Sequence, residues 1–188
     1  MLSHISMWIL KRLGWTIKVD LPDIKKFVVI AAPHTSNWDF LLGILAAKAI
    51  RLKVCWMGKH GMFRWPFGWF FRAIGGTPIH RGKGFNHIKQ LTDLFNQSDS
   101  LVLALAPEGT RSKMDHWKTG FHYIARGAKV PVLMAYLDFG HHEVGIGGLF
   151  YPTEDIEADF EKIRQFYADR PGKNPENASL IEVRKKDH

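Results

Sequence analysis

Short apolar runs alternate with segments of helical periodicity along most of this 188-residue chain. The runs are continuous and rich in branched or aromatic side chains, which is typical of buried strands. The run V-P-V-L-M-A-Y-L has Pro131 near its start, where a strand tolerates proline. The predicted strands cover residues 27–32, 54–57, 100–106 and 130–137, and residues 77–81 form a further short extended piece.

The segments between these runs predict helices. From Phe85 to Phe95, apolar residues recur every three or four positions and therefore share one helical face. Ser36 or Asn37 is the candidate cap of a helix that follows the first strand. Thr153 precedes an acid-rich turn and is the predicted cap of the last helix. The predicted helices cover residues 37–49, 65–76, 85–97 and 154–168.

Strands that alternate with helices are typical of α/β proteins. The sequence therefore predicts a single α/β domain over residues 1–188, with a central mixed, largely parallel sheet flanked by helices. Residues 1–15 predict a short helix, which either lies in a membrane interface or packs on the domain. The polar segment 171–188 predicts a loosely specified tail.

The charge of the chain points to a class of partner. The formal net charge is +8 and the pI is about 9.6. A basic surface favours a polyanionic partner, which is a nucleic acid, an anionic membrane or a phosphorylated substrate. We expect no nucleic-acid partner, because the sequence contains no recognisable nucleic-acid-binding module or basic stripe.

Cysteine and histidine usage narrows the chemistry further. The single cysteine, Cys55, excludes an internal disulfide and a cysteine-based metal cluster, and it is compatible with a reducing cytoplasm. The histidines show no paired spacing typical of metal ligands, so no metal is expected. The best candidate for a membrane span, residues 40–47, is far shorter than the roughly 20 residues that a span needs. The N-terminus does not have the charge order of a signal peptide.

His34 and Asp39 lie in the stretch A-A-P-H-T-S-N-W-D-F, directly after the first predicted strand. Their spacing alone carries little information, because this composition gives about half a His-x-x-x-x-Asp match by chance. Their position carries more, because open α/β proteins place their sites at strand-to-helix turns. A turn that begins at Pro33 can bring the two side chains together. The pair is either a base with its orienting carboxylate or a turn that happens to contain both.

A second turn, P-E-G-T-R-S, follows the strand at 100–106. Gly109 allows close approach of the backbone to a ligand, and its amide can face an anion. Arg111 offers a planar fork for phosphate, and Thr110 adds a hydroxyl group. The alternative is a surface turn in which Glu108 and Arg111 form an ion pair.

Together, these motifs resemble the glycerophospholipid acyltransferase family, the enzymes similar to 1-acylglycerol-3-phosphate acyltransferase. The resemblance covers residues 27–150 and includes two more blocks in the family's order, G-G-T-P-I-H-R and V-P-V-L-M-A. The segment W-K-T-G-F resembles the family's Lys-x-Gly segment. Five residues depart from the family's usual pattern, namely Pro33, Pro78, His80, Ala106 and Met134.

The resemblance implies acyl transfer from acyl-CoA or acyl-carrier protein to a hydroxyl group of a lysophospholipid or a glycerol phosphate. No other cofactor is expected. His34 would be the general base, and Asp39 would hold its tautomer. The acceptor phosphate would be bound by Arg81, Arg111 and Lys118. Backbone amides near Gly109 would stabilise the oxyanion, and Thr110 would line the same site. Glu108 would either bind the acceptor or brace its turn.

We further expect the protein to be cytoplasmic and peripherally associated with the anionic surface of the inner face of the membrane. Two alternatives remain. One is a non-catalytic peripheral lipid-binding protein, which intact His34 and Asp39 argue against. The other is an acyltransferase for a lysolipid without a phosphate.

Overall fold

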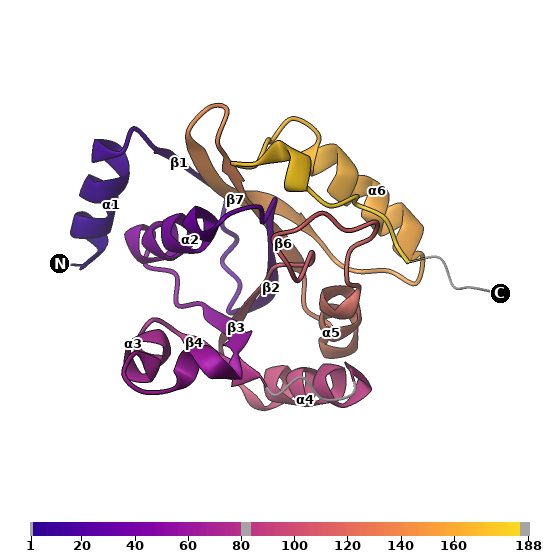
Figure 1. The fold of residues 1–188 in the computed structure, drawn as a ribbon. Helices are drawn as coiled ribbons and strands as arrows, with labels where there is room; N and C mark the ends of the chain where they lie inside the picture. Colours follow the sequence, from indigo (N-terminus) through magenta and orange to yellow (C-terminus); the bar gives the residue numbers. More distant parts are fainter. Residues whose placement is uncertain (1, 80–83, 185–188) are drawn as a thin grey trace.

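The computed structural model describes residues 2–79 and 84–184. One seven-stranded sheet has the order β1-β7-β6-β2-β5-β3-β4 (Figure 1). Neighbouring strands are parallel except for the antiparallel pair β6 and β7. This arrangement confirms the predicted α/β fold with a largely parallel sheet. The strands are β1 Thr16–Val19, β2 Lys26–Ala32, β3 Cys55–Lys59, β4 Gly76–Ile79, β5 Leu101–Leu105, β6 Val132–Asp138 and β7 Glu143–Phe150.

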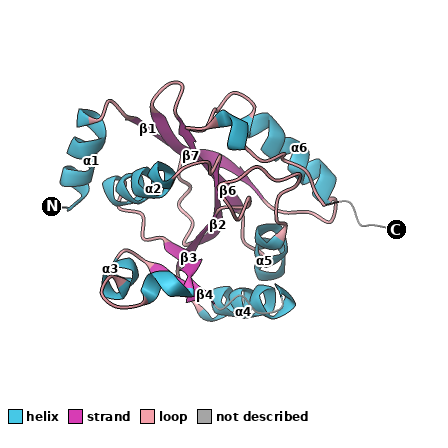
Figure 2. Cartoon of the chain, in the orientation of Figure 1, coloured by secondary structure: helices cyan, strands magenta, loops and turns pink. Residues whose placement is uncertain are grey.

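Helices cover both faces of the sheet (Figure 2). The helices α1, α2 and α3 lie on one side, and α4, α5 and α6 lie on the other (Figure 1). No helix in the described part of the chain is long and apolar enough to cross a membrane. The helices are α1 Leu2–Arg12, α2 Asn37–Ala49, α3 Gly68–Ala73, α4 Gly84–Gln97, α5 Gly120–Ala128 and α6 Ile156–Tyr167, with two short 3-10 turns, η1 His60–Phe63 and η2 Pro175–Asn177.

The central strand β2 contributes to a core on each side of the sheet. Val28 and Ile30 are buried in the cluster that includes residues of α4, α5 and α6. Phe27 and Val29 are buried in a second cluster on the other face. Alternate side chains of a strand point to opposite faces, so a strand covered on both faces is apolar at every position. This explains why the run F-V-V-I is continuous.

Three elements have no counterpart among the predictions, namely β1, β7 and α5. Glycines weaken the strand pattern of β7 because glycine has a low strand propensity. At Gly145, an added Cβ would lie 2.3 Å from Cζ of Tyr136 in the paired strand β6. The Tyr136 ring therefore occupies the space that a larger residue would need.

The ends of two predicted helices differ in the structure. The predicted cap Thr153 was wrong, because Asp155 lies directly before α6 and its Oδ1 accepts a 3.0 Å bond from the Ala158 amide. Thr153 instead donates its amide and hydroxyl to Asp159. Helix α3 is shorter than predicted, and Pro66 precedes it.

The register of β2 and β5 positions the two sequence motifs. These strands are parallel neighbours, and Ile30 is paired with Leu105 near their carboxyl ends. The loop after β2, residues 33–36, and the turn after β5, residues 106–112, therefore emerge from the same edge of the sheet. The carboxyl edge is where open α/β sheets bind ligands.

Candidate active site

His34 and Asp39 meet across the turn between β2 and α2. Nδ1 of His34 lies 3.3 Å from Oδ2 of Asp39. Asp39 is buried in the first turn of α2, where its Oδ2 accepts 2.7 Å bonds from the amides of Thr35 and Ser36. Its Oδ1 accepts a 2.7 Å bond from the Ser36 hydroxyl. The carboxylate is therefore held in place by the loop that carries the histidine.

These bonds also determine the ionisation of Asp39. Burial by itself would raise the pKa of its carboxyl group. The hydrogen bonds from His34 and from the amide and hydroxyl of Ser36 outweigh burial and hold the pKa below its usual value. Asp39 is therefore a carboxylate at neutral pH and can accept a proton-bearing Nδ1.

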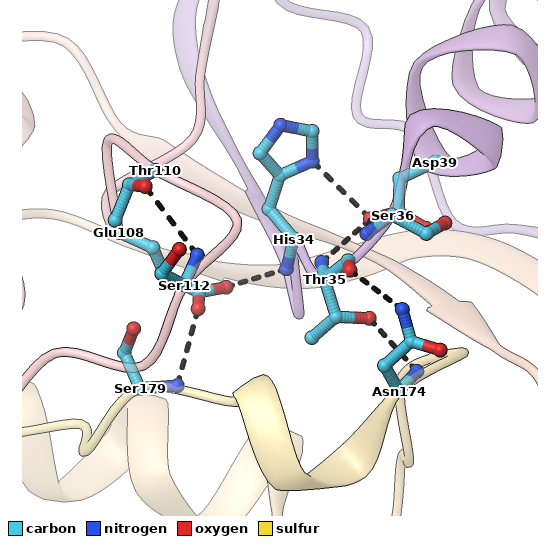
Figure 3. Close-up of polar contacts among 9 residues, drawn as sticks. All are labelled: His34, Thr35, Ser36, Asp39, Glu108, Thr110, Ser112, Asn174 and Ser179. Atoms are coloured by element: carbon cyan, nitrogen blue, oxygen red, sulfur yellow. Dashed lines mark hydrogen bonds and ion pairs between the residues drawn. The ribbon is translucent and has the colours of Figure 1, made fainter.

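The His34 ring is held at one nitrogen and open at the other. Its side chain keeps 22% of its surface exposed, and the ring edge opposite the Asp39 contact points away from the other residues drawn (Figure 3). With the proton on Nδ1, the free Nε2 can accept a proton from a bound molecule.

Glu108 connects three distant parts of the chain from a buried position. Only 2% of its surface is exposed. One carboxylate oxygen accepts the backbone amide of His34, and the other accepts the amide of Ser179 at 3.2 Å (Figure 3). Of the two expected roles for Glu108, this geometry favours the brace. Its partners are backbone amides, in contrast to the ion pair with Arg111 considered from the sequence.

The turn after β5 also brings Lys118 to Gly109. Gly109 has a left-handed φ of 67°, and a Cβ added there would lie 2.4 Å from Nζ of Lys118. The Lys118 amide also donates to the carbonyl of Pro107 at 2.9 Å. The backbone conformation therefore favours glycine, and the flexible end of the Lys118 side chain lies over it.

The other predicted site residues have more varied positions. The Thr110 hydroxyl accepts a 3.3 Å bond from the Ser112 amide, so it caps its own turn. Arg111 lies exposed in the same turn. Arg81 and the neighbouring His80 lie outside the described residues. The structure thus brings Lys118 to the turn that carries Arg111.

A strap formed by residues 171–184 crosses both motifs, in contrast to the loosely specified tail expected from the sequence. Asn174 donates its side-chain amide to the Thr35 carbonyl at 3.0 Å, and its backbone amide to the Thr35 hydroxyl at 3.2 Å. Ser179 receives the amide of Met114 in addition to its own bond to Glu108. No local pattern in the sequence identifies Asn174 or Ser179 as members of the site.

A cavity of about 400 Å³ lies beneath the strap. Its wall includes Pro33, Glu108, Trp117, Tyr167 and Ser179, but neither His34 nor Asp39. The reactive nitrogen of His34 therefore does not line this cavity. Among the described residues, no group of three or more histidine, cysteine or acidic side chains is arranged to hold a metal ion.

Comparison with known proteins places this geometry in a family. The family model described as Acyltransferase matches residues 16–137, which include His34, Asp39 and the turn after β5. The chain belongs to the acyltransferase family. The matched segment contains β1 to β5 and most of β6, so it spans the sheet edge on which the two motifs meet.

A solved structure supports the fold of this acyltransferase. It is the 1-acyl-sn-glycerophosphate (LPA) acyltransferase PlsC from Thermotoga maritima, with a TM-score of 0.57 and 19% sequence identity. The match covers 89% of this chain and 73% of the other. A search of curated proteins gave no match.

Proposed function

We propose that this acyltransferase moves a fatty acyl group from a thioester, either acyl-CoA or acyl-carrier protein, to a hydroxyl group of a lysophospholipid or glycerol-phosphate-type acceptor. The observation that carries the proposal is the His34–Asp39 pair, in which the carboxylate holds Nδ1 and leaves Nε2 facing outward. The second ring nitrogen is then available to the acceptor hydroxyl. Membership of the family and the fold shared with PlsC support the same reaction class.

In the proposed reaction, Nε2 of His34 takes the proton of the acceptor hydroxyl as its oxygen attacks the thioester carbonyl carbon. The tetrahedral intermediate then collapses, the carbon–sulfur bond breaks, and the thiolate receives the proton from the imidazolium. The products are an ester and a free thiol. Asp39 stabilises the imidazolium but does not take its proton. The chain needs no nucleophile of its own, because the acceptor oxygen attacks.

Charge around the turn after β5 suits an anionic acceptor. Lys118 lies over Gly109, and Arg111 is exposed in the same turn. We assign both to the acceptor phosphate together with Arg81, which lies outside the described residues. Amides near Gly109 are the proposed donors to the oxyanion. An arginine fork donates two parallel bonds to a phosphate, so Arg111→Lys should raise the acceptor KM more than the thioester KM.

The test is release of free thiol from acyl-CoA or acyl-carrier protein that depends on added lysolipid. His34→Ala should lower turnover by about 10²–10⁴-fold, the usual contribution of a general base. His141→Ala is a matched control, because Nδ1 of His141 is also paired with an aspartate, Asp138, at 2.7 Å, in the hairpin between β6 and β7.

Near wild-type turnover in His34→Ala would refute the assignment of the base. Lipid binding without thiol release in the wild type would instead favour the non-catalytic alternative. A preference of the wild type for an uncharged lysolipid would leave the base assignment intact and reject the proposed phosphate pocket.

A further inference from the structure

Large apolar side chains are exposed on the segment that leads into and forms α3. We call residues 64–72 the aromatic lobe. Trp65 is 91% exposed and Trp69 71% exposed, and Phe67 and Phe70 are also exposed. Isolated exposed apolar residues are common, but four aromatic residues within six positions form a patch that calls for a partner.

The lobe also has an inner layer of aromatic rings. Phe71 packs against Trp56 at 6.1 Å and Phe63 at 6.1 Å between ring centroids. Phe40 of α2 packs against Trp56 at 4.7 Å. These inner rings anchor α3 to the sheet and to α2. Phe70 packs on Phe71 at 5.7 Å, and Trp65, Phe67 and Trp69 are the most exposed rings of the lobe.

The charge of this part of the chain identifies the kind of partner. Between Asp39 and Asp93 the sequence contains nine lysines and arginines and no acidic residue. Arg64 and Arg72, at the two ends of the lobe, are both exposed. The chain segment that carries the exposed aromatic rings is therefore positively charged and fits an anionic partner.

The same side of the molecule carries a second exposed apolar stripe. Helix α1 packs against α2 through Leu10 and Leu42 and leaves Leu2 and Trp8 exposed. Because α2 contacts both α1 and the lobe, the three helices lie on one side of the sheet (Figure 1). Lys11 and Arg12 complete the last turn of α1.

We propose that the aromatic lobe, together with α1 on the same side of the sheet, docks on the surface of an anionic phospholipid bilayer. The rings of Trp65, Phe67 and Trp69 enter the boundary between headgroups and acyl chains, where tryptophan is enriched in membrane proteins. Arg64 and Arg72 extend to the phosphates while their aliphatic stems lie on the apolar layer. Tryptophan beside arginine also occurs in protein interfaces, but a segment this basic, with no acid for over 50 residues, suits a phosphate surface better.

Docking through the lobe also bears on the reaction, and this link to the reaction rests on the proposed function. Phe40 and Asp39 are neighbours in the first turn of α2, so the helix that contacts the lobe also holds the carboxylate. An acceptor lipid can then reach His34 from the bilayer to which the lobe is bound.

The experiment measures binding of the full chain to vesicles of phosphatidylcholine, with and without about one third phosphatidylglycerol. Wild type should bind the anionic vesicles, and added salt should weaken that binding because surface charges are screened. The triple variant Trp65→Ala, Phe67→Ala and Trp69→Ala should bind at least tenfold more weakly. A charge variant, Arg64→Glu, should bind anionic vesicles severalfold more weakly and leave any binding to neutral vesicles unchanged.

A matched control removes exposed apolar side chains from other elements, with Leu94→Ala, Tyr123→Ala and Leu149→Ala in α4, α5 and β7. It should bind as wild type does. Brominated lipid should quench tryptophan fluorescence in wild type and much less in the triple variant. Circular dichroism of each variant checks that the fold is retained.

Equal vesicle binding by the triple variant and wild type would overturn the proposal, and so would the absence of vesicle binding by wild type. It would also be overturned if wild type formed a dimer that the triple variant abolished while vesicle binding stayed the same. Thiol release with a short-chain lysolipid in solution separates this proposal from the proposed function. The triple variant should retain at least half of wild-type turnover there. Loss of vesicle binding alone would thus not contradict the proposed reaction. Absence of turnover in wild type would not contradict the proposed docking surface.

Discussion

Around His34, three distant segments of the chain are joined by hydrogen bonds to a few buried oxygen atoms, whereas the aromatic lobe turns most of its large side chains outward. The carboxylates of Asp39 and Glu108 together accept five such bonds from the loop after β2 and from the strap. The lobe is anchored by Phe71, which packs against Trp56 and Phe63.

The difference reflects the two proposed tasks of the molecule, proton transfer at His34 and contact with a lipid surface at the aromatic lobe. Proton transfer requires a fixed geometry, and buried charge-assisted hydrogen bonds provide it. Contact with a fluid surface requires apolar area and charge but no fixed partner atoms. Substitutions around His34 should therefore alter turnover, and substitutions in the lobe should alter only binding to lipid surfaces.

The largest expected effect comes from Asp39→Asn. Oδ2 of Asp39 faces donors of Thr35, Ser36 and His34, and Oδ1 accepts the Ser36 hydroxyl. An asparagine places an NH2 donor where one of these oxygens accepts, and it carries no charge to stabilise the imidazolium. We expect turnover to fall by about 10³–10⁴-fold, as in other triads that lose the orienting acid. Binding to anionic vesicles should not change. A variant that lost both properties would show that the two regions are not independent.

Glu108→Ala should have the next largest effect. Two buried amides, those of His34 and Ser179, would lose their acceptor. Each unsatisfied group costs about 1–3 kcal/mol, so the free energy of unfolding in urea should fall by about 2–6 kcal/mol. The value of kcat should fall while the acceptor KM stays within about twofold, because we place Glu108 behind the histidine as a brace. Glu108→Gln, which keeps one acceptor oxygen, should recover part of both losses. A change confined to the acceptor KM would instead make Glu108 a ligand.

Asn174→Ala should have a smaller effect on stability. It removes the side-chain bond to the Thr35 carbonyl but keeps the backbone bond to the Thr35 hydroxyl. The expected loss in the free energy of unfolding is about 1 kcal/mol. Asn177→Ala, in the same strap, is the control and should cost less. Equal losses for the two variants would mean that Asn174 does not hold the His34 loop.

The smallest expected effect concerns pH. Because the pKa of Asp39 is lower in the folded protein than its usual value of 3.8, the unfolded chain binds a proton at this residue more readily. The ionised carboxylate therefore adds stability above about pH 4, and this is lost as the pH falls through the folded pKa. The difference in unfolding free energy between wild type and Asp39→Asn should narrow below pH 4. A constant difference between pH 7 and pH 2 would contradict this account.

Much of the sheet could be predicted from the sequence because its signals are local. A strand buried on both faces, such as β2, is a continuous apolar run. Helix α2, residues 37–49, was predicted with its observed ends because Ser36, one of the two candidate caps, lies directly before it. The pairing of His34 with Asp39 was also accessible, because it spans a single turn. Their catalytic role stays a prediction.

The remaining features depend on contacts between residues far apart in the chain. Glu108 and Ser179 are 71 positions apart, and Asn174 and Thr35 are 139 apart. Polar residues in a segment without periodicity give no sign of such partners. Strand β7 was missed for a related reason. The ring of Tyr136 in the neighbouring strand occupies the space beside Gly145, and glycine weakens the strand pattern of the sequence.

A ribosome makes the strap after every other part of the site. At about 5–20 residues per second, roughly 7–30 s separate the synthesis of Asp39 from that of Ser179. Once residue 72 has been added, the nascent chain contains α1 and the aromatic lobe, but it lacks the residues that tie down Thr35 and complete the brace at Glu108. If the lobe docks as we propose, the order of synthesis lets the enzyme reach its membrane before it can act there.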